Sequence, residues 1–134
     1  MIITKRIGIW MNHSIAHIME FTAGLITTIT VESKPYEHGN KFGTVENESL
    51  SFFNEQHIQN EYYKKLEASI KDCKEVILFG PTYAKVKLYN ALRIDKRFAK
   101  TKIGVTQADD MTATEQQAFV SNHFSKERLF NTAL

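Results

Sequence analysis

The sequence of 134 residues contains a single cysteine, Cys73, and no apolar run long enough to cross a membrane. One cysteine cannot form an internal disulfide or a zinc site with several cysteine ligands, and this usage fits a reducing compartment. The opening segment MIITKRIGIW has no long apolar core and no small-residue cleavage site, so we expect no signal peptide. These absences predict a cytoplasmic protein with no membrane partner.

Motifs of common enzyme classes are also missing. The sequence has no Gly-x-Ser-x-Gly nucleophile elbow and no Walker or dinucleotide-binding glycine pattern. His13 and His17 are four positions apart, but their stretch reads as a turn and a strand, so this spacing does not place them on one helical face. The first expected strand has no carboxylate, which argues against a two-metal nuclease. We therefore expect no metal, no cofactor and no catalytic residue, and we lean toward a protein that is not an enzyme.

Residues 75–107 are the centre of the chain and read as strand, helix and strand. The unbroken apolar run VILF is typical of a strand covered on both faces. Gly80 and Pro81 end this strand, and we expect Pro81 in the first turn of the helix with Gly80 or Thr82 as its cap. The buried stripe of the helix is expected to contain Ala84, Leu88, Ala91 and Leu92.

Positive charge is concentrated in this helix and the connection after it. Residues 85–102 contain seven basic residues and one acid, a net charge of +6. The whole chain carries a net charge of +2, so the other residues together carry about −4. Such a segment can neutralise several phosphates, and Tyr83, Tyr89 and Phe98 are interleaved for stacking. The alternative is a solvated face whose acids lie elsewhere in space. The predicted RNA-binding residues are Lys85, Tyr89, Arg93, Lys96, Arg97, Lys100 and Lys102, of which the first three form an outer stripe at helical spacing.

The turn before the helix is a candidate anion site. A helix N-terminus that follows a glycine presents free N–H groups and a partial positive charge. Lys85, one turn into the helix, would add a point charge, so we predict a site made by Gly80, Thr82 and Lys85. An ordinary strand-to-helix turn is the alternative, because the stretch FGPTYAK has only one glycine.

The other elements complete a single α/β domain over residues 1–134. Apolar alternation and β-branched residues predict an antiparallel meander of strands at 6–11, 15–21 and 25–32, with the first strand half-buried. An apolar face predicts a helix over 51–73, and a capping box of Thr112 and Glu115 predicts the start of the last helix. The expected fold is a mixed five-stranded sheet in which the meander is followed by α-β-α-β-α.

Two segments have no regular pattern. Residues 33–50 contain a proline, two glycines and no hydrophobic period, and we predict a mobile loop that is either functional or locally disordered. Residues 125–134 are expected to be a tail.

Three stretches carry a family resemblance: IGIWMNHSIAHIMEF, LFGPTYAKVKLYNAL and RFAKTKIGVTQADDMT. With the order of elements from Lys5 to about Phe124, they resemble the middle domain of the eukaryotic and archaeal peptide-chain release factor and of Pelota. The resemblance is closer to stand-alone bacterial proteins related to that domain. It implies the fold of that domain, with ribonuclease H-like topology, and a place near ribosomal RNA.

The chain departs from the release factors in the loop before the long helix. In release factors that loop carries a Gly-Gly-Gln tripeptide, which places a glutamine in the peptidyl-transferase centre. The loop in the corresponding position here has no such tripeptide and contains His38, Gly39, Asn40, Lys41, Phe42 and Gly43. The resemblance therefore does not imply peptide release. Pelota also lacks the tripeptide and acts in ribosome rescue, so a ribosomal role is still implied.

Three functional hypotheses follow. The first is a non-enzymatic RNA- or ribosome-binding protein with a rescue, hibernation or accessory role in translation, whose partner is the ribosome or ribosomal RNA and not DNA. The alternative is a small-ligand or phosphate-binding enzyme that uses the Gly80 turn and the 33–50 loop. The third is a scaffold, which a homo-oligomer would suit, whose basic face meets an acidic protein.

Overall fold

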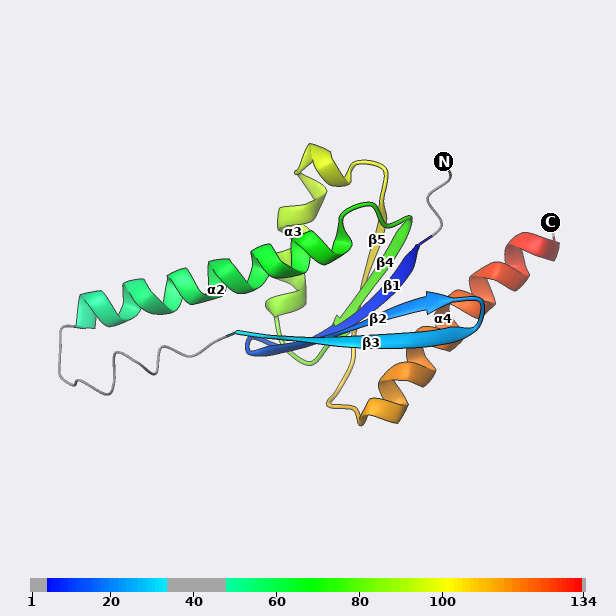
Figure 1. The fold of residues 1–134 in the computed structure, drawn as a ribbon, viewed down its shortest axis with the longest axis horizontal. Helices are drawn as coiled ribbons and strands as arrows, with labels where there is room; N and C mark the ends of the chain where they lie inside the picture. Colours follow the sequence, from blue (N-terminus) through cyan, green and yellow to red (C-terminus); the bar gives the residue numbers. More distant parts are fainter. Residues whose placement is uncertain (1–4, 34–47, 134) are drawn as a thin grey trace.

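A computed structural model describes residues 5–33 and 48–133 and shows a mixed five-stranded sheet flanked by helices (Figure 1). The strand order is β3-β2-β1-β4-β5, in which β1 pairs antiparallel with β2 and parallel with β4. The predicted α/β fold class is confirmed. The elements are β1 (Arg6–Met11), β2 (Ile15–Thr22), β3 (Leu25–Glu32), α2 (Glu48–Ile70), β4 (Glu75–Gly80), α3 (Ala84–Arg93), the 3-10 helix η1 (Lys96–Phe98), β5 (Lys102–Gln107) and α4 (Ala113–Ala133).

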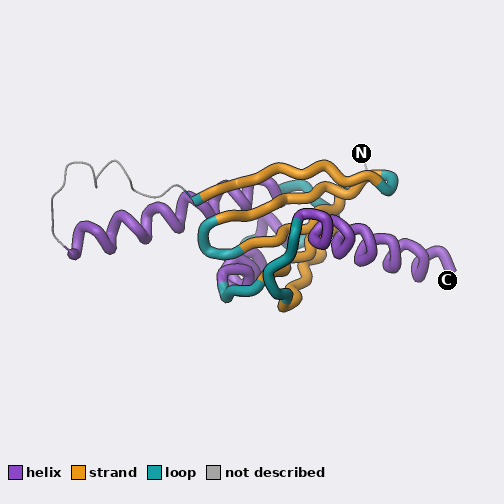
Figure 2. The backbone as a smooth tube through the Cα atoms, turned by 90° about the horizontal axis from the view of Figure 1, so that it is seen from below, coloured by secondary structure: helices purple, strands orange, loops and turns teal. Residues whose placement is uncertain are grey.

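The two edges of the sheet are β3 and β5, and β3 forms the upper margin of the sheet in Figure 2. Apolar side chains on one face of the sheet pack with α2 and α3. Those on the other face pack with α4. The basic segment of α3 and η1 therefore lies on the face opposite to α4, toward the β5 edge.

The central strand β1 is buried on both faces. The alternating apolar side chains from Ile7 to Met11 pack toward α2 and α3, as expected. The opposite face carries Gly8 and Trp10, and Trp10 is only 6% exposed beneath α4. The prediction of a half-buried first strand is therefore wrong. The physical reason is that α4 comes close to Gly8, where an added Cβ would clash with Val120.

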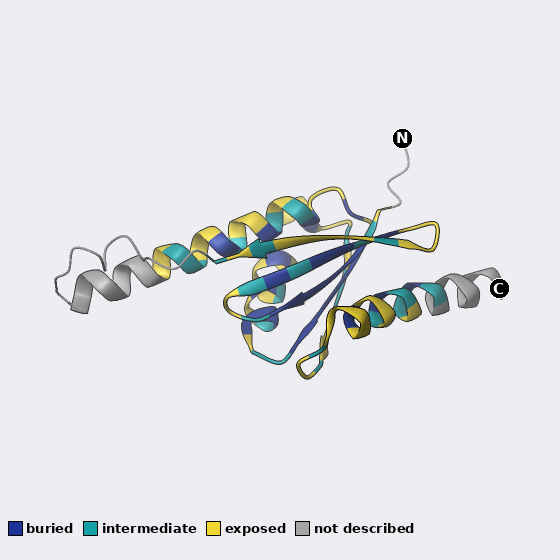
Figure 3. Ribbon diagram, turned by 60° about the horizontal axis from the view of Figure 1, so that its bottom comes forward, coloured by how far each residue is buried: buried dark blue, intermediate teal, exposed yellow. Residues whose placement is uncertain are grey.

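Burial decreases from the centre of the sheet toward β3 (Figure 3). β4 is buried over its whole length, as its apolar run predicts. Most residues of β3 are exposed, including two large apolar side chains, Leu25 at 74% and Ile29 at 60%. The β-branched composition of β3 thus predicts a strand correctly but does not reveal that its surface is open.

The long helix α2 begins and ends three residues earlier than predicted. Asp72 has a φ of +67°, a left-handed conformation that cannot continue a helix, so α2 does not reach Cys73. Cys73 is nevertheless buried, as expected, and desolvation raises the pKa of its thiol to about 11. A thiol with this pKa is protonated at neutral pH, which fits a packing role.

The last helix begins as its sequence predicts. The Thr112 backbone N–H donates to Glu115 Oε1 at 2.9 Å, and the Glu115 N–H donates to Thr112 Oγ1 at 3.2 Å, so both halves of the capping box are formed. The helix then continues to Ala133. Residues 125–133, which were expected to be part of a tail, therefore belong to this helix.

Candidate nucleic-acid interface

The turn between β4 and α3 is built around Gly80. Its φ of +148° suits glycine, and an added Cβ would clash with the backbone oxygen of Met11 on the neighbouring strand. The helix begins at Ala84, so Pro81 is not in its first turn and that prediction is wrong. The N-cap residue is Tyr83 and not Gly80 or Thr82, so the predicted cap is also wrong, although Thr82 Oγ1 accepts a hydrogen bond from the Ala84 N–H at 3.2 Å.

Lys85 is buried against this turn and is only 3% exposed. Its Nζ donates to the Thr82 carbonyl at 2.6 Å and to Gln107 Oε1 at 2.9 Å. Desolvation by the surrounding atoms lowers the pKa of Lys85. The prediction that Lys85 belongs to an outer basic stripe is wrong, because its ammonium group is used to join the turn to the end of β5.

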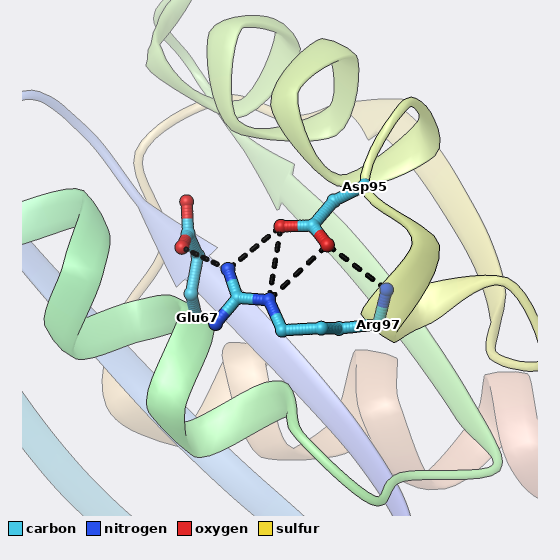
Figure 4. Close-up of polar contacts among 3 residues, drawn as sticks. All are labelled: Glu67, Asp95 and Arg97. Atoms are coloured by element: carbon cyan, nitrogen blue, oxygen red, sulfur yellow. Dashed lines mark hydrogen bonds and ion pairs between the residues drawn. The ribbon is translucent and has the colours of Figure 1, made fainter.

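Arg97 is exposed, but two acids hold its guanidinium group (Figure 4). Its Nη2 atom lies 2.6 Å from Asp95 Oδ2 and 3.3 Å from Glu67 Oε1 on α2. Asp95 Oδ1 also accepts the Arg97 backbone N–H at 2.9 Å, which caps η1. The hydrogen bonds that Asp95 accepts from the Arg97 side chain and backbone lower the pKa of Asp95. The acids that the solvated-face alternative requires are thus present at this position.

Lys102, at the start of β5, also has an acidic neighbour. Its Nζ lies 3.8 Å from Glu75 Oε2, and the same buried carboxylate lies 3.7 Å from Arg6 Nε and 3.9 Å from His123 Nε2. Lys102 therefore belongs to a cluster of charged residues around Glu75, and this carboxylate balances part of the positive charge of Lys102.

Four cations remain on the segment, and we call them the basic surface: Lys87, Arg93, Lys96 and Lys100. All four are exposed, and none forms an ion pair with a described residue. The Arg93 guanidinium lies over the ring of half-buried Tyr89, 5.8 Å from its centroid, which restricts the arginine without neutralising it. Lys87 is one of the seven basic residues of the segment but is not among the predicted RNA-binding residues.

The three aromatic side chains predicted to interleave with the cations have different environments. Tyr83 is 59% exposed and is available for stacking. Phe98 is buried in the core, with the Arg97 guanidinium 5.2 Å from its ring centroid, so its predicted role in base stacking is wrong. Only tertiary structure separates these cases, because in the sequence each residue stands between a polar residue and an alanine.

Other predicted features are partly beyond the described residues. The loop from His38 to Gly43, and most of the 33–50 segment, lies outside them. Among the described residues, a cavity of about 280 Å³ lies between the end of β3 and α2, and both charged and apolar side chains line it, including Glu32, Ile58 and Glu61. The described residues contain no group of three or more His, Cys, Asp or Glu placed to hold a metal ion. Over the same residues, no helix combines the length and apolarity needed to span a membrane.

Comparison with solved structures finds similar folds in two archaeal Pelota proteins and in an archaeal translation termination factor. Archaeoglobus fulgidus Pelota matches with a TM-score of 0.57 and 13% identity, over 96% of this chain and 36% of that protein. An archaeal translation termination factor matches with a TM-score of 0.55 and 16% identity, over 85% of this chain and 32% of the factor. Thermoplasma acidophilum Pelota matches with a TM-score of 0.51 and 17% identity, over 84% of this chain and 30% of that protein.

These identities are low, so the likeness concerns the fold. No model of a protein family matches the sequence, and no curated protein does. The chain spans about a third of the length of each of the three structures. It therefore has a fold of the release-factor and Pelota type.

Proposed function

We propose that this chain is a non-enzymatic RNA-binding protein of translation, and that its basic surface contacts ribosomal RNA. The observation that carries the proposal is the set of four exposed cations on α3 and on the connection from α3 to β5, which no described acid neutralises. The fold adds support, since one of the similar structures is a translation termination factor. Exposed Tyr83, on the turn before the same helix, offers a ring for stacking on an unpaired base.

The expected binding is driven mainly by phosphate contacts. Four cations that each neutralise one phosphate would give a slope of log affinity against log salt of about −3 to −4. Lys85 and Arg97 are not expected to add to this slope, because their charged groups already bind acceptors within the protein. Specificity for one ribosomal site would then come from the shape of the RNA.

A matched pair of double variants tests this proposal. Arg93→Glu with Lys96→Glu reverses half of the basic surface, and Lys64→Glu with Lys65→Glu makes the same charge change on the exposed face of α2. In titrations of ribosomal RNA at several salt concentrations, we expect the first variant to reduce the slope by about 2 and the second to leave it near the wild-type value. Equal losses in both variants would mean that only net charge matters, and the proposed surface would be rejected.

The proposal excludes peptide release by the mechanism of release factors. The sequence contains no Gly-Gly-Gln tripeptide. We therefore propose a rescue, hibernation or accessory role, with the loop from His38 to Gly43 as a second contact. A release assay on ribosomes that carry peptidyl-tRNA tests this, and release above the level without added protein would contradict it.

A second candidate function is supported by Lys85. Its buried ammonium group has only neutral hydrogen-bond acceptors among the described residues, so a phosphate group could displace one of them. In this alternative, Gly80, Thr82 and Lys85 bind the phosphate of a small substrate. NMR titration with inorganic phosphate and with a mononucleotide is the test, and unchanged amide signals from residues 80–85 would remove this candidate.

A further inference from the structure

β3 is an edge strand of the described sheet, and its outer side could pair with another strand. No described strand pairs with its outer side, and Figure 2 shows it at the margin of the sheet. From Leu25 to Val31 the strand contains no charged residue and no proline. Proteins commonly protect a free edge with lysine, proline, a bulge or a covering element. This edge has the length and composition of a strand that accepts a partner.

The hairpin turn determines which backbone groups point outward. Thr22 pairs with Leu25 across Ala23 and Gly24, whose φ values of +52° and +84° belong to a two-residue turn of type I′. Such a turn closes with a hydrogen-bonded pair, so Leu25 and every second residue after it bond to β2. The Ser33 N–H agrees, since it donates to the Ser14 carbonyl at 2.7 Å. The N–H and carbonyl groups of Ile26, Thr28 and Thr30 therefore point away from the sheet.

The exposed apolar side chains favour a second copy of the same chain as the occupant. Leu25 and Ile29 lie on one face of β3 because they are four residues apart. If two β3 strands pair antiparallel about a two-fold axis at Thr27, Leu25 of each copy lies opposite Ile29 of the other. This register places both exposed apolar residues in cross-strand pairs, which are favourable contacts. It also places the outward groups of Ile26 opposite those of Thr28 in the other copy.

The geometry points to a symmetric homodimer in which two β3 strands join the sheets of two copies into one. Charge does not oppose this arrangement, because the paired segment contains no charged residue. In this register residues 25–29 of the two copies pair, a segment about 17 Å long at about 3.4 Å per residue, so the interface is smaller than that of a standard stable complex. The dimer is therefore expected to be concentration-dependent.

Sedimentation equilibrium of the full chain over a range of concentrations tests the dimer. We expect the wild type to approach twice the monomer mass at millimolar concentration. Ile29→Lys should remain a monomer, because it places a charge at the joined edge. Ile94→Lys is the matched control, since Ile94 is 83% exposed at the end of α3, far along the chain from β3, and it should dimerise like the wild type. A monomeric wild type, or a dimer that persists in Ile29→Lys, would overturn the inference.

A second variant pair tests the register and does not depend on a loss of folding. Thr27→Cys would place two cysteines directly opposite each other, within the distance range of a disulfide, whereas Thr28→Cys would not. Native Cys73 is buried and should not compete. We expect Thr27→Cys to form a covalent dimer on mild oxidation and Thr28→Cys to remain largely monomeric under denaturing conditions. The reverse pattern, or no cross-link in either variant, would contradict the proposed pairing.

Discussion

At the scale of single residues, Lys85 joins the start of α3 to the end of β5. Its Nζ donates to the Thr82 carbonyl and to Gln107 Oε1, and Gln107 Nε2 in turn donates to the Pro81 carbonyl at 3.4 Å. Both acceptors of the ammonium group are neutral, and burial lowers the pKa of Lys85. The long aliphatic stem of lysine allows this arrangement, since the stem packs in the core while the head reaches polar atoms.

The variant Lys85→Met should reduce stability without weakening RNA binding. It keeps the apolar stem and leaves the Thr82 and Gln107 acceptors without their donor, so we expect a loss of about 1 to 3 kcal/mol in the free energy of unfolding. Arg93→Met should show the opposite pattern, because Arg93 is exposed and its charge belongs to the basic surface. Urea unfolding and RNA titration of both variants provide the two readouts. A folded Lys85→Met protein that no longer binds RNA would contradict the structural role of Lys85.

At the scale of elements, Arg97 connects η1 to the long helix. It contacts Asp95 within its own segment and Glu67 on α2, which lies thirty positions earlier in the sequence. Phe98, the next residue, is buried in the core beneath the same helices. The connection between α3 and β5 is therefore fixed at its middle, which holds Lys96 and Lys100 on either side in a defined position.

Stability should depend on the ionisation of Asp95. Hydrogen bonds from Arg97 lower the folded-state pKa of Asp95 below its usual 3.8. The stabilising contribution is therefore present above pH 3.8 and is lost as pH falls through the lower folded pKa. Unfolding measured from neutral to acidic pH should show the wild type more stable than Asp95→Asn at neutral pH, with the difference shrinking in acid. A difference that does not change with pH would contradict this role.

The sequence predicts elements better than it predicts their surroundings. The strands and the capping box of Thr112 follow from local patterns, and the structure confirms them. The burial of Trp10 depends on the approach of α4 to Gly8. The ion pair of Arg97 with Glu67 depends on a helix that is distant in the sequence. Neither contact has a local signal. Helical spacing likewise grouped Lys85 with Tyr89 and Arg93, although the acceptor that holds Lys85 comes from β5.

At the scale of the whole molecule, the basic surface and the outer side of β3 lie at opposite edges of the sheet. α3 and η1 lie beside β5, whereas β3 is the other edge strand. A dimer formed through β3 would therefore leave both basic surfaces free at its two ends. Two linked RNA-binding surfaces can bind one large RNA more tightly than either alone, provided that the sites match their separation.

The proposed function is tested most directly by sedimentation of tagged protein through sucrose gradients with ribosomes, at low and moderate salt and with RNase as a control. We predict that the protein migrates with ribosomes or a subunit at low salt, that moderate salt reduces this fraction, and that Arg93→Glu with Lys96→Glu abolishes it. The Lys64→Glu and Lys65→Glu control should migrate like the wild type. Protein that stays at the top of every gradient would contradict ribosome binding and would limit the likeness to Pelota and the termination factor to the fold.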